Sequence, residues 1–257
     1  AQAAPAMKVH FLDLGSLRAN KNDMIADQDK EAKLDLPLFA LLIEHPTLGN
    51  IVYDTGIPGD WETELIDRVK TSYPVQSSRT IKEALADKGL TPDDIDLLIV
   101  SHLHFDHSGG IKYFAGTKAG SRVLLSRDAY DTVSNSDSWV KKFFLMPGID
   151  FILYEGNLRL SDDITLFFQE THAPGLAGLM LKTKKNGTLI LTNDAVYTEE
   201  VYRKKILPGS VYNIYKTPEL FYKNIEMLQD MVKEHKGTLI FGHDAKQIKK
   251  YLGKTLE

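Results

Sequence analysis

The stretch "SHLHFDHSGG", residues 101–110, places three histidines and an aspartate within six positions, although the chain of 257 residues holds only eight histidines. Residues two apart in extended backbone point the same way, so His102 and His104 can address one metal ion. Asp106 and His107 are neighbours beyond them, where two glycines imply a turn, and they can reach a second ion. Ions about 3.5–4 Å apart are usual in two-metal hydrolytic sites. The stretch therefore predicts a dinuclear metal centre.

Further candidate ligands follow other apolar runs of the chain. Asp54 comes after "IVY", His102 after "LLIVS", Asp194 after "LILTN" and His243 after "LIFG". In layered α/β folds, ligand sites gather just beyond the carboxyl ends of strands. A zinc ion takes about four ligands and the opening stretch supplies four residues for two ions, so His172, Asp194 and His243 are the natural additions. Imidazole and carboxylate together suit zinc, or otherwise manganese, iron or cobalt.

Taken singly, some of these residues also fit simpler roles. His172, in "ETHAPG", would suit the cap of a turn, and Asp194 would suit an Asx-turn, but their positions and the unmet coordination favour ligand roles. His10 and His45 lie in strand-like segments without acidic company, and we expect them to be packing or surface residues. His235 lies near a predicted helix C-terminus, where its charge suits the helix dipole.

The composition excludes several classes of protein and of site. The chain is 43% hydrophobic and its formal net charge is −4, whereas a surface that binds nucleic acid is usually strongly basic. We therefore expect no nucleic-acid partner. The absence of cysteine excludes disulfides and thiolate metal sites. No apolar run approaches the ~20 residues that are needed to cross a bilayer, so we expect no membrane span.

Hydrophobic periodicity predicts one α/β domain over residues 7–257, with two sheets and helices outside them. Strands are predicted at 8–17, 38–45, 50–56, 95–101 and 238–244, a strand–turn–strand unit at 178–196, and helices at 60–73, 77–89, 217–237 and the C-terminus. The long helix is expected to begin at Thr217 and Pro218 and to close at Gly237. The segments 38–56 and 178–196 share one pattern, which suggests two related half-sheets.

The first residues, "AQAAPA" at 1–6, precede Met7 and are interpreted as a tag or as the stub left by signal-peptide cleavage. A tag leaves the cytoplasm as the default compartment. A cleavage remnant implies a secreted or periplasmic protein.

The whole pattern resembles a known family. H-x-H-x-D-H after an apolar strand, with His172, Asp194 and His243 downstream, is similar to the signature of the metallo-β-lactamase superfamily. Four segments look like those of the N-acyl homoserine lactonases, in the same order: "LDLPLFALLIEHPTLGNIVYDTG" (34–56), "IVSHLHFDH" (99–107), "LTNDAVYT" (191–198) and "TLIFGHD" (238–244). The resemblance covers nearly the whole chain from residue 8 and implies a four-layer αββα sandwich.

The resemblance also implies roles for single residues. It implies that His102, His104 and His172 hold one metal ion, that Asp106, His107 and His243 hold the other, and that Asp194 bridges them. Tyr197 matches a tyrosine that faces the substrate carbonyl in this family. Asp54, in "DTG", would orient a ligand rather than bind metal.

These roles suggest hydrolysis of a lactone ring by a metal-activated hydroxide. Tyr197 would stabilise the developing oxyanion, and Asp106, or water near it, would protonate the departing alkoxide. Phe105, Leu176, Met146 and the "FFLM" run at 143–146 are expected to line an acyl-chain pocket, or else to belong to the core. The expected partner is a small-molecule lactone or ester, and the oligomeric state stays open, a homodimer included.

The chain departs from the resemblance at two places. Leu176 stands in "HAPGL" where relatives commonly have a histidine, which should make that side of the pocket more apolar. The segment 18–33 does not match closely, and loops near a site set substrate choice. Phosphotriesterases and aryl esterases like methyl parathion hydrolase remain a competing interpretation. So does a catalytically silent metal-binding interaction module, although an idle site has no physical need for buried charges.

Overall fold

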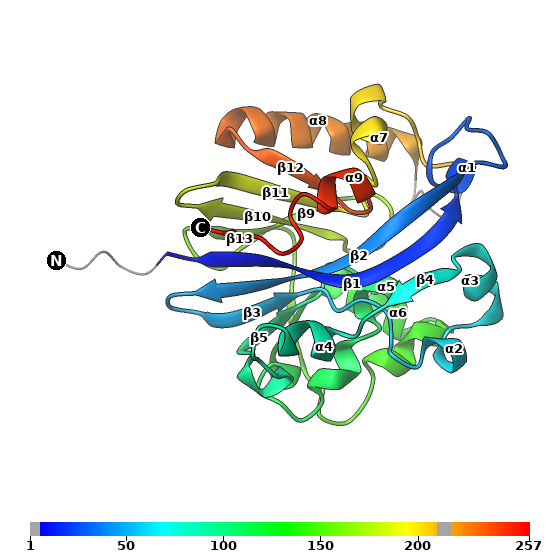
Figure 1. Ribbon diagram of the computed structural model, residues 1–257. Coiled ribbons are helices and arrows are strands. Elements are labelled where there is room, and N and C mark those ends of the chain that lie inside the picture. The colour runs from blue at the N-terminus through cyan, green and yellow to red at the C-terminus, as the bar shows by residue number, and fades with distance from the viewer. Residues whose placement is uncertain (1–5, 210–216) are drawn as a thin grey trace.

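Two β-sheets form the centre of the computed structural model, which describes residues 6–209 and 217–257 (Figure 1). In the described residues the larger sheet has the order β13-β1-β2-β3-β5-β6-β7, with β4 paired to β1. Its strands are β1 (Lys8–Asn20), β2 (Lys33–His45), β3 (Gly49–Tyr53), β4 (Val75–Ser78), β5 (Leu97–Ile99), β6 (Val123–Ser126), β7 (Phe151–Tyr154) and β13 (Thr255–Leu256). The smaller sheet has the order β12-β11-β10-β9-β8. Its strands are β8 (Leu158–Arg159), β9 (Ile164–Phe168), β10 (Ala177–Thr183), β11 (Gly187–Asn193) and β12 (Thr238–Phe241).

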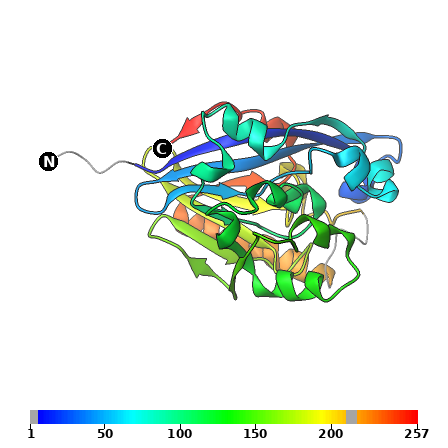
Figure 2. The same ribbon diagram turned by 90° about the horizontal axis from the view of Figure 1, so that it is seen from below.

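Helices cover the outer faces of both sheets. The α-helices are α1 (Lys21–Met24), α2 (Trp61–Glu64), α3 (Asp67–Ser72), α4 (Ile81–Ala86), α5 (Phe105–Ser108), α6 (Arg127–Ser134), α7 (Glu199–Lys204), α8 (Pro218–His235) and α9 (Ala245–Ile248). Short 3₁₀ turns lie at Pro92–Asp94, Ile111–Phe114, Gly120–Arg122 and Trp139–Phe143. Helix α8 lies on the smaller sheet, while α4, α5 and α6 lie on the far side of the larger one (Figures 1 and 2). The predicted αββα layering is confirmed.

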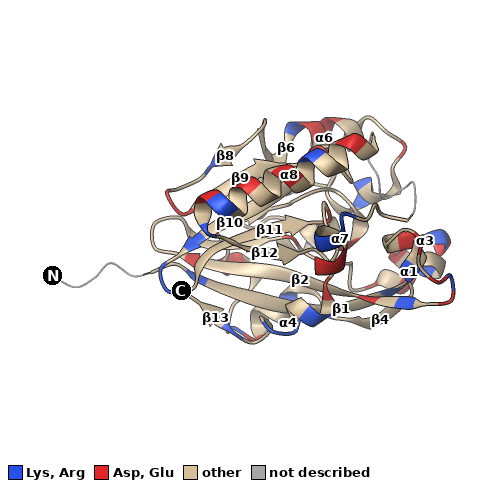
Figure 3. Cartoon of the chain, turned by 90° about the horizontal axis from the view of Figure 1, so that it is seen from above, with Lys and Arg blue, Asp and Glu red and all other residues tan. Residues whose placement is uncertain are grey.

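The strands are apolar on both faces because both faces are buried. On β3, Ile51 and Tyr53 belong to the core between the sheets and Val52 to the core beneath the helices. On β11, Leu189 and Leu191 face the first core, and Ile190 faces the second. Charged residues lie mostly on the helices and loops, with both signs interspersed (Figure 3). In the described part of the chain, no helix combines the length and the apolar character that a membrane crossing requires.

The two strand–turn–strand units predicted from their shared pattern are both antiparallel hairpins, and they lie in different sheets. Strand β2 pairs with β3 in the larger sheet, with Leu42 opposite Val52. Strand β10 pairs with β11 in the smaller sheet, with Met180 opposite Ile190. Each hairpin ends just before a candidate site residue, Asp54 or Asp194.

Several expected element boundaries are wrong. The helix predicted at 60–73 divides into α2 and α3, because Leu65 and Ile66 take extended backbone angles. The helix predicted from residue 77 begins only at Ile81, and the residues before it form β4. Helix α8 ends in a left-handed residue at Lys236 rather than at Gly237. Of the predicted N-terminal stub, residues 1–5 lie outside the described residues.

His10 and His45 are packing residues, but the expectation that they lack acidic company is wrong. His10 Nε2 lies 2.6 Å from a Glu44 carboxylate oxygen on the neighbouring strand. His45 Nε2 lies 3.0 Å from Asp163, and its Nδ1 accepts from the backbone N–H of Leu48. These carboxylates come from elements that pair or pack only after folding, so local sequence could not indicate them.

Candidate metal centre

The candidate ligands meet where parallel strands end. Strands β3 and β5 are parallel, and so are β11 and β12, which places the carboxyl ends of each pair together. Asp54 follows β3, His102 follows β5, Asp194 follows β11 and His243 follows β12. His172 reaches the same place from the loop between β9 and β10. Both sheets therefore contribute to one site at their shared edge.

One cluster of possible ligand atoms comes from His102, His104, His172 and Asp194. His172 Nε2 lies 3.3 Å from His102 Nε2, 2.9 Å from His104 Nδ1 and 3.3 Å from Asp194 Oδ2. With metal–nitrogen bonds of 2.0–2.1 Å, neighbouring ligands of a tetrahedral zinc ion lie about 3.4 Å apart. These separations fit one ion held between the four side chains.

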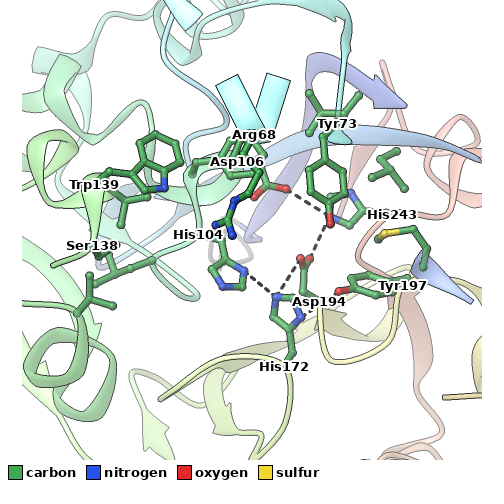
Figure 4. A pocket seen from close by; sticks show the side chains of 18 of the residues that line it. Arg68, Tyr73, His104, Asp106, Ser138, Trp139, His172, Asp194, Tyr197 and His243 are labelled. Atoms are coloured by element: carbon green, nitrogen blue, oxygen red, sulfur yellow. Dashed lines mark hydrogen bonds and ion pairs between the residues drawn. The ribbon is translucent and has the colours of Figure 1, made fainter. Parts of the chain in front are cut away.

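A second cluster comes from Asp106, His107, Asp194 and His243. Asp194 Oδ1 lies 3.2 Å from both His107 Nε2 and His243 Nε2. Asp106 Oδ2 lies 3.5 Å from His243 Nε2 and 3.6 Å from His107 Nε2. Asp194 thus presents one carboxylate oxygen to each cluster, which is the arrangement of a bridging ligand (Figure 4).

Two buried atoms of the second cluster lack the hydrogen bonds that buried polar groups normally make. Among the described residues, His107 Nε2 and Asp194 Oδ1 have no hydrogen-bond partner. A metal ion would satisfy both lone pairs at once. The residues present therefore fit the dinuclear centre that the sequence predicts.

Outer hydrogen bonds fix which nitrogen His102, His107 and His243 turn toward the clusters. His107 Nδ1 bonds to Asp54 Oδ2 at 2.8 Å, and His243 Nδ1 bonds to the carbonyl of Pro37 at 3.0 Å. His102 Nδ1 bonds to Ser101 Oγ at 3.0 Å, and that hydroxyl donates in turn to Asp54. Such acceptors hold a proton on Nδ1 and leave Nε2 free for a metal.

Asp54 is the hub of this outer network. Its carboxylate accepts from the backbone N–H and hydroxyl of Ser101 and from the side-chain amide of Asn193. Asn193 also reaches the hydroxyl of Tyr53. One buried carboxylate, at the end of β3, therefore links the ends of β5 and β11 and the imidazole of His107 by hydrogen bonds. It thereby positions ligands from both sheets.

The backbone around the site is strained at three non-glycine residues. Asp54 has φ 62°, His172 φ 64° and Asn193 φ 49°, all in the left-handed region. Such conformations cost ~1–3 kcal/mol each and concentrate at functional sites. Gly242 shows a related constraint, because an added Cβ would lie 2.7 Å from the backbone oxygen of Asn193.

Without metal ions, the pKa values of the imidazoles diverge between the clusters. Burial lowers the pKa of His102 and His172 well below the usual range, and that of His104 also falls. Burial also opposes charge on His107, but Asp194, Asp106 and Asp54 outweigh it and raise its pKa well above the usual range. Because metal ligands must be deprotonated, metal binding at the second cluster should displace protons.

Five of the candidate ligands, His104, Asp106, His172, Asp194 and His243, line a pocket of about 360 Å³. We call the floor these five residues together with His102, His107 and Asp54, which are buried behind them and do not line the pocket. The wall is the rest of the pocket lining, apart from Tyr197. Its side chains are those of Leu17, Met24, Leu36, Arg68, Val69, Tyr73, Leu103, Phe105, Thr132, Val133, Ser136, Ser138, Trp139 and Val140. A mostly apolar cleft with a few convergent polar groups is the usual form of a small-molecule site.

Tyr197 lies between floor and wall. Its hydroxyl is 3.0 Å from His172 Nδ1 and its ring is buried (Figure 4). Burial, with the negative charge of Asp194, raises the pKa of the Tyr197 phenol well above its usual range, so the phenol keeps its proton at neutral pH. If His172 Nδ1 donates to the phenol oxygen, the phenol hydrogen is free to point into the pocket.

Comparison with known proteins now decides the family. A family model of the metallo-beta-lactamase superfamily matches residues 35–243, which span every candidate ligand. The chain belongs to the metallo-β-lactamase superfamily. Its αββα layering is the fold of that superfamily, as the sequence resemblance implied.

Within the superfamily, the chain is similar to lactonases over nearly its whole length. It is 28% identical to an N-acyl homoserine lactonase of Bacillus thuringiensis, over 94% of this chain and 95% of the relative. It is 26% identical to N-acyl homoserine lactonase AiiB of Agrobacterium fabrum, over 93% and 94%. A solved N-acyl homoserine lactone hydrolase, with N-hexanoyl-L-homoserine at its catalytic metal centre, superposes with a TM-score of 0.82 at 27% identity, over 95% and 96%.

For this superfamily member, two of the residues predicted to line the pocket lie elsewhere. Phe105 does line it, but Leu176 has no exposed surface and packs in the core beneath the helices. Its carbonyl accepts from the backbone N–H of Gln169 across the loop. Met146 lines a separate surface groove with Leu145 and Phe144. The local "FFLM" pattern could not indicate that Phe143 packs in the core while Met146 faces the groove.

Several other site residues were not predicted from the sequence. Ser101 and Asn193 each precede a candidate ligand, so their positions could have been noticed, and Asn tolerates the left-handed backbone found at 193. Arg68 and Tyr73 line the pocket together with Trp139, which lies far from them in sequence, and no local signal marks these residues.

Proposed function

We propose that the protein is a dinuclear metal hydrolase that opens the ring of N-acyl homoserine lactones or similar lactones. The observation that carries this proposal is the pair of His/Asp clusters that share Asp194 on the floor of a largely apolar pocket. The lactonases among its relatives supply the substrate class.

We assign the ligands as follows. His102, His104 and His172 would hold one ion, Asp106, His107 and His243 the other, and Asp194 both. The imidazole and carboxylate donors suit zinc, with manganese, iron and cobalt as alternatives. Two such ions would supply a hydroxide at neutral pH and would polarise the scissile carbonyl.

Tyr197 would stabilise charge as it develops on that carbonyl. The phenol stays protonated. With Nε2 of His172 on a metal ion, the proton of that imidazole would be on Nδ1 and would be donated to the phenol oxygen, so the phenol hydrogen would remain available to the substrate. A donor that is held in place in a buried site stabilises an oxyanion without reorganising during the reaction.

Asp106 would carry the proton. It lines the pocket and directs Oδ2 toward His107 and His243, which leaves its other oxygen for transfer. This carboxylate would take the proton that water releases when the hydroxide forms, and the hydroxide oxygen would bond to the carbonyl carbon. The ring C–O bond then breaks and the departing alkoxide takes the proton, so that an N-acyl homoserine results.

A second candidate activity is the hydrolysis of aryl esters or phosphotriesters. The observation that favours it is the aromatic part of the wall. The Phe105 ring centroid lies 6.3 Å from that of Tyr73 and 6.1 Å from that of Trp139, and this surface would suit a flat aryl group.

One panel assay separates these activities. Lactones, aryl esters and phosphotriesters would be offered to a single metal-loaded preparation, with Asp194→Ala protein as the blank. We expect kcat/KM to be highest for the lactones. A higher value for an aryl ester or phosphotriester would replace the proposed function by the second candidate, and no turnover of any class would indicate a silent metal-binding module.

A further inference from the structure

A buried glutamine connects two segments that carry candidate ligands of the first cluster. Gln169 follows β9, begins the loop that carries His172 and has no exposed surface. Its side-chain N–H donates to the carbonyl of Thr192 at 2.8 Å. Thr192 lies near the end of β11, shortly before Asp194. One side chain therefore joins the loop of His172 to the strand end of Asp194.

The carbonyl that Gln169 contacts lies where the strand pairing is irregular. The register between β11 and β12 shifts between Leu191 and Asn193, so Thr192 has no opposite residue on β12. An extra residue of this kind disrupts the ladder locally. The amide of Gln169 gives this carbonyl a hydrogen bond that comes from outside the two paired strands.

The oxygen of the Gln169 amide is held as well. It accepts from the side-chain amide of Asn224 at 3.2 Å. Asn224 is a buried residue of α8, the long helix that covers the smaller sheet (Figure 1). The carbonyl of Thr192 can only accept, so it selects the nitrogen of Gln169, and the oxygen of Gln169 then faces the donor nitrogen of Asn224. Both ends of the amide are therefore fixed in direction.

The loop between Gln169 and Leu176 holds His172 in an unfavourable conformation. The φ angle of His172 is 64°, in the left-handed region. Such a residue keeps its conformation only where surrounding contacts hold it. The backbone N–H of Gln169 closes the base of the loop by donating to the carbonyl of Leu176. The side chain of Gln169 then attaches that base to β11.

The imidazoles of the second cluster are held by other groups. His107 bonds to the carboxylate of Asp54, and His243 bonds to the carbonyl of Pro37. Among the described residues, neither imidazole is hydrogen-bonded to Gln169. The connection made by Gln169 therefore concerns the first cluster in particular.

We propose that Gln169 is a positioning residue for the first metal site, which fixes the loop of His172 relative to Asp194. This inference rests on the dinuclear centre of the proposed function. Outer partners that orient ligands contribute to metal affinity although they do not touch the metal. Loss of the Gln169 amide should therefore weaken the first site more than the second.

The test measures the two zinc affinities separately, by competition with a chelator. It would compare wild type with Gln169→Met, which removes both amide bonds, and with Asn224→Leu, which removes only the outer one. His172→Ala and His243→Ala each remove a ligand of one site alone and identify which affinity belongs to which site. Leu228→Ala is the matched control for lost stability, because Leu228 is fully buried on the same helix as Asn224.

We expect Gln169→Met to lower the affinity of the first site about 10–100-fold, the range for loss of an outer partner, and that of the second site much less. Asn224→Leu should lower the affinity of the first site to a smaller extent, because the bond to Thr192 remains. Leu228→Ala should unfold at a lower denaturant concentration while both affinities stay near wild type.

An equal loss at both sites in Gln169→Met, or the same selective loss in Leu228→Ala, would overturn the role of Gln169 while the dinuclear centre stands. If Gln169→Met does not fold, Asn224→Leu decides, and an unchanged affinity of its first site would overturn the role. A wild type that binds only one zinc ion would remove the proposed centre and this inference together. Two bound ions without lactone turnover would contradict the lactonase function alone.

Discussion

The floor and the wall of the pocket are built in different ways. The floor comes from the carboxyl ends of β3, β5, β11 and β12, from α5 and from the loop between β9 and β10, and the carboxylate of Asp54 links several of these elements by hydrogen bonds. The wall comes mainly from short helices and turns, among them α1, α3, α6 and Trp139–Phe143, and from side chains such as Trp139 that pack through aromatic contacts. Directional hydrogen bonds hold the floor, whereas non-directional packing holds most of the wall.

We infer from this difference that the floor residues determine bond breaking and the wall residues determine substrate choice. Changes to the floor should abolish metal binding or turnover for every substrate. Changes to the wall should redistribute kcat/KM among substrates while the metal ions stay bound.

Replacing Asp194 by alanine should have the largest effect, because one residue faces both clusters. Metal content and turnover should fall by more than the ~10–100-fold that removal of an outer partner typically costs. Elemental analysis and lactone turnover would measure this, with Asp35→Ala, which removes an exposed partner of Arg18, as the control. A fully metallated, fully active Asp194→Ala protein would show that the bridge is another residue.

Tyr197→Phe should lower turnover about 10–100-fold at saturating metal, less than the ~10²–10³ that a sole oxyanion donor contributes, because metal ions share this duty. The loss should appear in kcat more than in KM, since the interaction strengthens as charge develops. His172 also loses its phenol partner, so the affinity of the first site for metal should fall slightly. Unchanged kcat in a metal-saturated Tyr197→Phe protein would remove the phenol from catalysis.

Asp54→Asn should weaken metal binding by about 10–100-fold while the ligands themselves remain. The second site should suffer more, because His107 bonds to Asp54 directly and His102 only through Ser101. Competition with a chelator would resolve the two affinities. An equal loss at both sites would mean that Asp54 acts on the sheet ends as a whole rather than on His107.

A pair of substitutions separates wall from core. Phe105→Ala should raise KM several-fold for long acyl chains and leave metal content unchanged, because the ring lines the pocket. Leu176→Ala should lower the free energy of unfolding by ~2–5 kcal/mol, because the side chain is fully buried, with KM near the wild-type value. Steady-state kinetics and chemical denaturation would measure both. A Leu176→Ala protein of normal stability and raised KM would place Leu176 in the pocket after all.

The same division explains what the sequence could predict. Their positions directly after apolar strands were enough to predict that Asp54, Asp194 and His243 lie at the site, because ligand sites in α/β folds form beyond the carboxyl ends of the strands. The spacing of residues 102–107 was enough to separate two clusters. The αββα layers followed from the family resemblance and from strands that are apolar on both faces.

The wall could not be predicted, because its members meet only in three dimensions. Arg68 and Trp139 lie about seventy residues apart in the chain, yet they line one pocket. The break between α2 and α3 depends on the extended backbone at Leu65 and Ile66, and no glycine or proline marks it. Leu176 and Met146 were predicted to line the pocket and do not. The side chain of Leu176 packs in the core, and that of Met146 lines another groove.

The most direct test is a metal titration that is followed by lactone hydrolysis. Metal-free protein would receive zinc in steps up to several equivalents per chain, and ring opening of an N-acyl homoserine lactone would be measured at each step, together with bound zinc. We expect two ions per chain at saturation, and ring opening that reaches its plateau only with the second. Saturation at one ion per chain, or two bound ions without ring opening, would contradict a dinuclear lactonase.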